Sequence, residues 1–313
     1  MAARFVSSFE SPPGPWWAPS FLASAQSLLI VLIITGPFSL KNAADGAAEV
    51  VVENFMHGGE RVMNMIYPWE TAVLQKLNGT WKPVCGGALI EATGRFVVTS
   101  ASCFDPESAS KVVAGTHTSD KGGETIDVRR AFIHDGFSNA TRTNNVAVLQ
   151  LRKPLALSEH IKVIPMADGN RALNGKDCVL PGWGEVTVES WNGLYKIEMS
   201  IISRQHCRAA WHNEYVPGSL CASIKPRGDS KPCEVAAAGP LVCYYKNSPY
   251  PPKFRRRRHH ARDKTQDFDP YAVGLVNFAM ATCSEANRPI VFTRLSHYLP
   301  WIYRVINNAT HLP

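Results

Sequence analysis

Eight cysteines, distributed between positions 85 and 283, constrain the fold of this chain more than any other feature. An even number of cysteines behind an N-terminal entry signal predicts a disulfide framework formed in an oxidising compartment. Eight cysteines allow about 105 complete pairings, so their number alone does not assign the partners. The rest of the composition is that of a globular protein, with 45% hydrophobic and 19% charged residues.

The entry signal is an apolar run near the N-terminus, from Leu28 to Ile34. It is shorter than the roughly 20 residues that span a membrane, and small residues follow it, so we expect a cleaved signal peptide and a secreted, extracellular product. An uncleaved signal-anchor, giving a single-pass membrane protein, and a buried core helix are the alternatives. Residues 1–48 are interpreted as signal peptide or signal-anchor and spacer. Glycosylation sequons at Asn78, Asn139 and Asn308 agree with the secretory route.

Short apolar or alternating runs follow the leader, separated by Gly, Pro, Asn and Asp, and this pattern predicts strands. Three examples are Phe96 to Thr99, Val146 to Leu151 and Tyr271 to Val276. A helix is predicted at the C-terminal end, where Ser296 can cap a segment in which Leu299, Ile302 and Ile306 recur at helical spacing. The sequence therefore predicts an all-β architecture closed by a C-terminal helix.

Local motifs of this chain resemble those of the chymotrypsin-like serine proteases, and they follow one another in the family's order. They are Tyr67-Pro68-Trp69, Cys85 to Ile90, Phe96 to Cys103, Cys178 with Gly182-Trp183-Gly184, Gly239 to Cys243, Pro289 to Leu295 and Tyr298 to Ile302. The resemblance implies a homology domain over residues 49–307 with two six-stranded antiparallel β-barrels. The first barrel is expected at about residues 56–165, the second at 166–307, and a tail at 308–313.

The resemblance also implies how the cysteines pair, with none left over. The implied disulfides are Cys85–Cys103, Cys178–Cys243, Cys207–Cys221 and Cys233–Cys283.

Three positions that the resemblance assigns to catalysis hold residues unsuited to it. The histidine position is Ser102, the aspartate position is Asn145 and the serine position is Ala237. A serine hydroxyl is no base near neutral pH, an asparagine is neutral, and an alanine offers no nucleophile. Losing one such residue typically costs about 10⁴ to 10⁶ in rate. We therefore expect an inactive homologue, a pseudoprotease.

The surrounding motifs depart from the family's pattern as well. Val235 stands where a glycine would supply an oxyanion donor, and Ala236 stands where an aspartate would receive the new N-terminus after activation. The activation segment corresponds to Met56 to Gly59, and Phe55 before it does not suit trypsin-like cleavage. We expect activation by cleavage to be absent.

The primary specificity pocket is expected to be blocked. Lys231 occupies its floor position, and Ala279 and Ile290 replace the glycines of its walls. The ten histidines show no metal-ligand spacing, and His259-His260 are interpreted as part of a solvated loop, so no metal and no cofactor are expected.

A basic insertion spans residues 245–270, where eight Lys and Arg outnumber three Asp, so that it carries five of the seven net positive charges of the chain. Its prolines and its dense charge predict an exposed loop. Its centre is a run of four arginines, Arg255, Arg256, Arg257 and Arg258, which we call the arginine run. Three hypotheses remain open for it: a solvated loop without a partner, a site for a polyanion such as a heparin-like glycan, or a processing site for basic-residue convertases. The secretory context argues against nucleic acid.

Taken together, these patterns favour a secreted, non-catalytic homologue that binds another protein as an adaptor, decoy or cofactor of a protease, inhibitor or receptor. The alternative is a defence protein that binds polyanions or microbial surfaces through the arginine run. The third hypothesis, an active serine endopeptidase, would need a nucleophile elsewhere, and the sequence contains no Gly-x-Ser-x-Gly motif.

Overall fold

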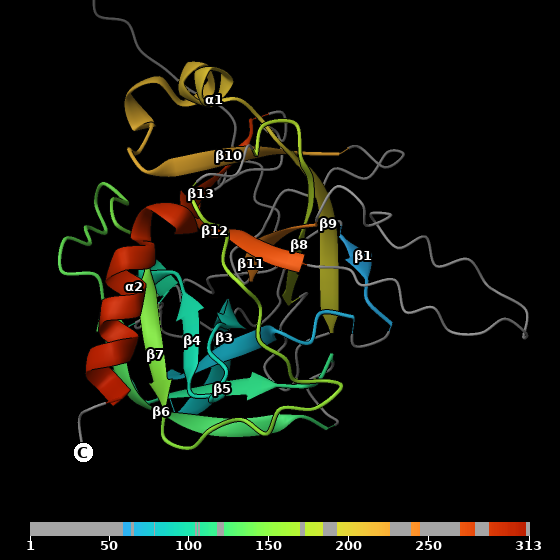
Figure 1. Ribbon diagram of the computed structural model, residues 1–313, viewed down its shortest axis with the longest axis vertical. Helices are drawn as coiled ribbons and strands as arrows, with labels where there is room; N and C mark the ends of the chain where they lie inside the picture. Colours follow the sequence, from blue (N-terminus) through green and yellow to red (C-terminus); the bar gives the residue numbers. More distant parts are fainter. Residues whose placement is uncertain are drawn as a thin grey trace, which may run out of the picture. The chain divides into compact units, whose positions relative to one another are not determined.

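The computed structural model describes a set of segments that all belong to one structural unit, residues 51–313 (Figure 1). The described residues are 59–63, 66–77, 79–103, 105, 107–117, 122–169, 173–183, 193–225, 239–244, 270–278 and 288–310.

The first half of the described chain forms a closed antiparallel barrel of six strands. In order around the barrel these are β2 (Glu70–Leu77), β3 (Thr80–Leu89), β4 (Phe96–Thr99), β7 (Ala147–Leu151), β6 (Glu124–Ile133) and β5 (Ser110–Ala114). Strands β4 and β7 are buried along their whole length, as expected for continuous apolar runs. Val73, Leu89, Val97 and Leu149 pack together inside this barrel.

The second half forms another closed ring of six antiparallel strands. Its order is β8 (Asp177–Trp183), β9 (Leu194–Ile201), β10 (Ser219–Ile224), β13 (Ile290–Arg294), β12 (Pro270–Phe278) and β11 (Pro240–Tyr244), and β11 pairs with β8. A two-residue strand, β1 (Glu60–Arg61), adds to β9 from outside. The predicted all-β fold of two six-stranded antiparallel barrels is thereby confirmed.

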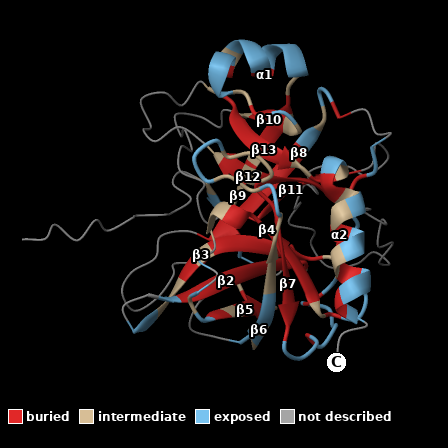
Figure 2. Cartoon of the chain, turned by 90° about the vertical axis from the view of Figure 1, so that its left-hand side faces the viewer, coloured by how far each residue is buried: buried red, intermediate tan, exposed pale blue. Residues whose placement is uncertain are grey.

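The predicted C-terminal helix is present as α2 (Leu295–Thr310). It buries one face, including Ile302 and Ile306, while its outer face is exposed (Figure 2). With Ser296 as the cap, the helix was expected to begin at His297, but it begins two residues earlier, at Leu295. Ser296 lies in its first turn and accepts a hydrogen bond from Arg294 Nε at 3.0 Å. It also continues past residue 307 into the segment expected as a tail, and Ala309 is buried there.

A second helix, α1 (Arg204–Trp211), was not predicted from the sequence. Its N-cap is Ser203, whose hydroxyl accepts from the backbone N–H of His206 at 3.2 Å. Its buried residues are Cys207 and Trp211, one helical turn apart, and most of its remaining residues are polar. So short an apolar face gives little helical periodicity in the sequence. Two single-turn 3₁₀ segments, Ala101–Cys103 and His212–Glu214, complete the described helical structure.

Three of the four disulfides that the resemblance implies lie within the described residues. They are Cys85–Cys103, Cys178–Cys243 and Cys207–Cys221. The fourth pair, Cys233–Cys283, lies outside the described residues.

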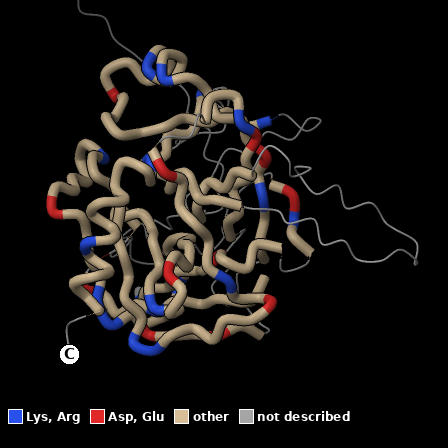
Figure 3. Tube along the Cα trace, viewed as in Figure 1, with Lys and Arg blue, Asp and Glu red and all other residues tan. Residues whose placement is uncertain are grey.

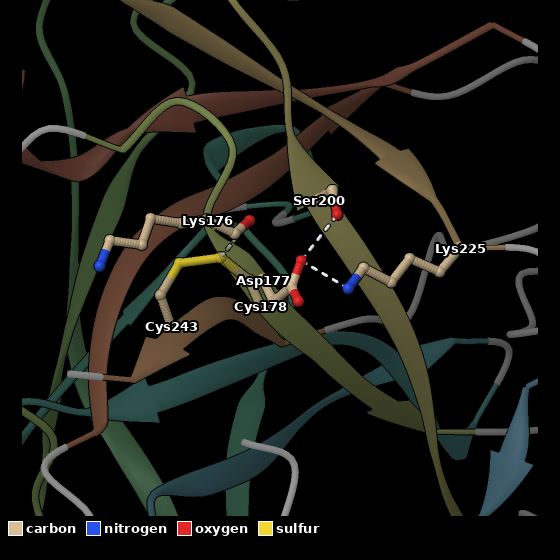
Figure 4. A network of polar contacts seen from close by, with 6 residues as sticks. All are labelled: Lys176, Asp177, Cys178, Ser200, Lys225 and Cys243. Atoms are coloured by element: carbon tan, nitrogen blue, oxygen red, sulfur yellow. Dashed lines mark hydrogen bonds and ion pairs between the residues drawn. A yellow bond between two sulfur atoms is a disulfide. The ribbon is translucent and has the colours of Figure 1, made fainter. Parts of the chain in front are cut away.

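Beside Cys178–Cys243, the Asp177 carboxylate accepts from Ser200 Oγ at 2.8 Å and lies 2.5 Å from Lys225 Nζ (Figure 4). Partial burial alone would raise the pKa of Asp177, but the hydrogen bonds from Lys225 and Ser200 and the charge of Lys225 outweigh it and lower this pKa. The carboxylate thus ties β8 to β9 and to the residue after β10.

In the part of the chain that the structure describes, neither helix is long and apolar enough to cross a membrane. The apolar run Leu28 to Ile34 lies outside that part.

Candidate functional site

The structure brings together two of the three positions expected at the reaction centre. Ser102 lies in the 3₁₀ turn after β4, and Asn145 precedes β7, so neighbouring strands of the first barrel present both residues at the same end. The Asn145 side chain accepts from the Ser102 backbone N–H through Oδ1 at 2.7 Å. Its Nδ2 donates to Ser102 Oγ at 2.9 Å. The two residues form a closed ring of two hydrogen bonds.

The same amide also bonds to the second barrel. Asn145 Nδ2 donates to Asn277 Oδ1 of β12 at 2.8 Å, and Asn277 Nδ2 in turn donates to the Arg142 carbonyl at 3.0 Å. Thr293 of β13 donates through Oγ1 to the Asn145 carbonyl at 3.0 Å. We call Ser102, Asn145, Asn277 and Thr293 the amide network, because amide groups supply most of its hydrogen bonds across the contact between the barrels.

Because the amide network is buried, the loss of any one of its hydrogen bonds would destabilise it. Asn145 is 0% exposed and Asn277 is 5% exposed, so their amide groups lie where water is scarce. Both N–H groups of the Asn145 side chain are used, and its oxygen accepts from Ser102. Replacing such a buried amide would leave its hydrogen-bond partners unpaired, which costs free energy. The amide therefore favours the one side-chain arrangement in which all these bonds form.

The chemistry of the amide network is that of neutral groups. Peptide hydrolysis on this kind of site requires an imidazole that takes a proton and a carboxylate that orients it. Among the described residues, no histidine hydrogen-bonds to Ser102 or Asn145. His134 instead packs against Tyr298 and Trp301 of α2, with ring centroids 5.5 and 4.9 Å away, and burial is the main cause of its lowered pKa.

The loop beside the amide network is held in an unusual backbone conformation. Arg142 and Asn144 both have positive φ, 55° and 52°, which is uncommon for residues other than glycine. Asn144 Nδ2 donates to the Gly136 carbonyl at 2.8 Å, and the Tyr298 hydroxyl donates to Asn144 Oδ1 at 3.2 Å. These bonds, together with the one from Asn277 to Arg142, fix the loop in position.

A cleft of about 390 Å³ opens next to this loop. Its lining residues are Ala140, Thr141, Arg142, Thr143, Asn213, Glu214, Tyr215, Val216, Pro217 and Phe278. Phe278 directly follows Asn277 in β12, so the cleft and the amide network share a strand. We call this cleft, with the lining given above, the Phe278 cleft.

A buried carboxyl that the sequence analysis missed lies at the contact between the barrels. Glu70, at the start of β2, is 1% exposed, and neither carboxylate oxygen has a hydrogen-bond partner among the described residues. Burial raises its pKa well above the ordinary value. The carboxyl group lies directly against Gly239, where an added Cβ atom would overlap it. A charged residue in the otherwise apolar run after Trp69 was the sequence signal for this site.

Three of the other predicted site residues can be placed. Ile290 is 3% exposed and packs in the apolar core of the second barrel, and its expected role at the pocket wall stays a prediction. Asn139 and Asn308, the two described sequons, are both exposed.

The remaining predicted site residues lie outside the described residues, so their expected roles stay predictions. From the pocket, the oxyanion and the nucleophile positions these are Lys231, Val235, Ala236, Ala237 and Ala279. From the basic insertion they are Arg255, Arg256, Arg257, Arg258 and His259-His260, and from the N-terminal part they are Asn78 and residues 55–58. Within the described part of the chain, no three His, Cys, Asp or Glu side chains are grouped so as to hold a metal ion.

Comparison with known proteins agrees with the two-barrel fold. The family model described as Trypsin matches residues 57–302. The mouse (Mus musculus) protein named Serine protease 57 is 28% identical to this chain over 235 residues, which cover 72% of this chain and 73% of the mouse protein.

Proposed function

This chain belongs to the trypsin family, and from that premise we propose that it is a secreted family member which does not hydrolyse peptides and instead binds another protein through the face formed by the amide network and the Phe278 cleft. The observation that carries the proposal is the pair of hydrogen bonds between Ser102 and Asn145. By the resemblance, Ser102 and Asn145 stand at the two positions where hydrolysis would need an ionised, proton-transferring pair, and both side chains are neutral.

Energetic reasoning supports the loss of catalysis. In the family's mechanism the carboxylate stabilises the imidazolium that forms when the base takes a proton. An asparagine carries no charge, and a serine at the base position cannot take that proton at neutral pH. With Ala237 at the nucleophile position, the residual rate enhancement would have to come from binding and from oxyanion donors, and Val235 disfavours the latter.

A binding role is supported by what the site retains. The Phe278 cleft is bordered by a loop that three side-chain hydrogen bonds hold in place, and a pre-ordered surface loses little entropy on association. The cleft combines the aromatic rings of Tyr215 and Phe278 with Arg142, residue types that are enriched at protein interfaces. The partner class is a protease, an inhibitor or a receptor in the extracellular space, where a disulfide framework is expected.

The catalytic part of the proposal is tested with a broad active-site serine hydrolase probe, with trypsin as the positive control. We expect no labelling of the secreted chain. The triple variant Ser102→His, Asn145→Asp, Ala237→Ser should also stay inactive on peptide substrates, because Lys231 and Ile290 occupy pocket positions and the activation segment is altered. Labelling of the natural chain, or clear peptide cleavage by the triple variant, would show that the catalytic part is wrong.

The binding part is tested by capture on a panel of secreted proteases, protease inhibitors and receptor ectodomains. The variant Asn213→Trp places a large side chain at the exposed edge of the Phe278 cleft. Its matched control is Ala156→Trp, on an exposed segment after β7 that does not line the cleft. A partner that binds the natural chain and Ala156→Trp but not Asn213→Trp supports the proposal. A partner that tolerates Asn213→Trp contradicts the assigned face.

A second candidate function rests on the charge distribution. Five of the seven net positive charges lie in residues 245–270, and the arginine run would attract a polyanion such as a heparin-like glycan or a microbial surface. This candidate belongs to a different class, because it needs neither the amide network nor the Phe278 cleft.

A further inference from the structure

A second and larger cleft, of about 600 Å³, lies beside helix α1. It is lined by residues of helix α1, of the ends of β9 and β10 and of the start of α2, and by Gly169, Leu173 and Asn174. We call it the α1 cleft. Its volume falls within the range of ordinary ligand sites, about 300 to 1,000 Å³.

Apolar side chains form much of the lining of the α1 cleft. They belong to Leu173, Ile201, Ile202, Tyr215, Pro217 and Leu220. Leu173, Ile201 and Leu220 are otherwise buried in the barrel, so their contribution to the wall is a continuation of the core. Such a wall favours an apolar group of a ligand over a fully hydrated one, since removing apolar surface from water is favourable.

The cationic residues in the lining are two arginines, Arg204 and Arg294, and no Asp or Glu is among the described lining residues. Arg294 is half-buried and donates to Ser296 Oγ at 3.0 Å, while Arg204 is exposed and lies over the Tyr215 ring at 6.0 Å. The nearest acids along the chain, Asp168 and Glu214, adjoin lining residues without lining the cleft themselves. The charge that the cleft offers to a ligand is therefore positive.

Basic positions stand out on α1 in the view of Figure 3, at the top of the molecule as drawn. Arg208, one turn after Arg204, also stacks on Tyr215, at 5.2 Å, but it does not line the cleft. Of the two arginines that stack on Tyr215, only Arg204 lines the cleft, and its charge together with that of Arg294 favours an anionic ligand.

The walls of the α1 cleft are fixed by covalent and backbone bonds. The disulfide Cys207–Cys221 joins α1 to β10. Backbone hydrogen bonds from Ile202 to Cys221 and from Arg294 to Gly218, each 3.0 Å long, hold the neighbouring segments. A ligand would therefore meet a cleft that is already formed, and little entropy would be lost in shaping it.

We propose that the α1 cleft binds an acidic peptide segment of another protein, with an apolar side chain in the cleft and flanking carboxylates on Arg204 and Arg294. A peptide offers both chemistries within a few residues. A sulfated glycan offers the charge without an apolar group for the wall of Leu173, Ile201 and Leu220, so the cleft suits it less well. The inference does not rest on the proposed function, because neither the amide network nor catalysis enters it.

The experiment measures binding of short capped peptides by isothermal titration calorimetry on the full chain. The probes are acetyl-Glu-Glu-Xaa-Glu-Glu-amide with Leu, Phe or Trp at the centre. The same peptides with Ala at the centre, or with Gln in place of every Glu, are the matched controls. The four residues of the arginine run are replaced by alanine in the protein used, so that the run does not contribute to the signal.

Saturable binding of at least one apolar-centred peptide, with a Kd below about 1 mM, is expected. Arg204→Gln and Arg294→Gln should each weaken that binding about tenfold, because each removes a charge-assisted hydrogen bond. Arg208→Gln removes the same charge from the same helix and should weaken it less than about twofold. Asn174→Trp, which fills the exposed mouth of the cleft, should abolish binding.

Several results would overturn the proposal. One is no saturable binding of any probe. Another is an equal loss with Arg208→Gln and Arg204→Gln, which would mean that a diffuse positive field attracts the peptides. A sulfated heparin hexasaccharide that binds as tightly as the best peptide, and that tolerates Asn174→Trp, would replace the peptide by a glycan at the rim.

Discussion

The side-chain amide of Asn145 and residue Ser102 hydrogen-bond each other twice, because Asn145 Oδ1 accepts from the Ser102 backbone N–H and Asn145 Nδ2 donates to Ser102 Oγ. Replacing Asn145 by Asp would turn a donor that faces Ser102 Oγ and Asn277 Oδ1 into an acceptor. The serine hydroxyl can rotate and donate, but the Asn277 oxygen would then face a buried carboxylate. We expect Asn145→Asp to lower the free energy of unfolding by about 2–4 kcal/mol at neutral pH.

Chemical denaturation of Asn145→Asp at pH 7 and at pH 4 checks this expectation. The loss should shrink at the lower pH, where protonation of the carboxyl restores one donor. Asn213→Asp is the matched control, because Asn213 is exposed and should tolerate the same change within about 0.5 kcal/mol. Equal stability of the two variants would mean that the amide network contributes nothing to the fold.

The buried Glu70 carboxyl predicts an unusual pH dependence of stability. Its pKa is raised in the folded state, so between the ordinary value near 4.5 and the raised value the folded chain holds a proton that the unfolded chain has lost. The contribution of Glu70 to stability is therefore complete below about pH 4.5 and declines as the pH rises through the folded-state pKa.

Glu70→Gln removes this titration. We expect the variant to gain in stability relative to the natural chain as the pH is raised from 4 to 8, with a difference in Tm of a few degrees (roughly 2–4 °C per kcal/mol) at the upper end. Thermal unfolding over this pH range measures the difference. Glu159→Gln, at an exposed position, should give a curve parallel to the natural chain. A constant difference between Glu70→Gln and the natural chain would contradict the raised pKa.

The contact between Glu70 and Gly239 can be measured as a coupling. Gly239→Ala should destabilise the chain by about 1–3 kcal/mol, because the added methyl group would overlap the carboxyl. In the background of Glu70→Ala the same change should cost much less, and a double-mutant cycle should return a coupling of at least about 1 kcal/mol. Gly169→Ala is the control, since Gly169 faces open space. If the effects of Gly239→Ala and Glu70→Ala on the free energy of unfolding are additive, the two residues are not in contact.

The arginine run predicts retention on immobilised heparin at moderate salt. Replacing its four residues by alanine should move elution to clearly lower salt, since the run supplies half of the Lys and Arg of the basic insertion. A control with the same change in charge replaces four exposed cations elsewhere, Arg152, Lys153, Lys162 and Arg304. Retention that survives loss of the run, or that falls equally in the control, excludes this polyanion site.

The hypothesis that the arginine run is a processing site is tested separately from heparin binding, by mass measurement. Intact mass of the deglycosylated, secreted chain should then show one species when non-reduced and two fragments after reduction, because the expected Cys233–Cys283 bridge spans the loop. Replacing the run by alanine should restore a single chain after reduction. Fragments that separate without reduction would show that this pair is not bridged.

The sequence allowed the barrels to be predicted because strand-length apolar runs and ordered motifs are local features. Ile302 and Ile306 likewise marked the C-terminal helix by spacing alone. The helix α1 was missed because only Cys207 and Trp211 are buried, and its position depends on the bridge to Cys221.

The contacts of the site between residues far apart in the sequence could not be predicted, for a different reason. Asn277 meets Asn145 across 132 positions of the chain, and Glu70 meets Gly239 across a still longer separation. Asn277 belongs to none of the motifs recognised in the sequence, and the motif that begins at Gly239 does not indicate which residue contacts it. The acidic residue Glu70 in an otherwise apolar strand indicated an unusual position, but the residue that it contacts could be found only from the structure.

The amide network keeps its protonation state in acidic and in neutral surroundings. Its members are serine, asparagine and threonine side chains and backbone groups, none of which gains or loses a proton between an acidic vesicle and neutral extracellular fluid. The face built on it would present the same outline in both surroundings. A partner acquired in one compartment would find the same face in the next, and release would have to be triggered by something other than acidity at this network.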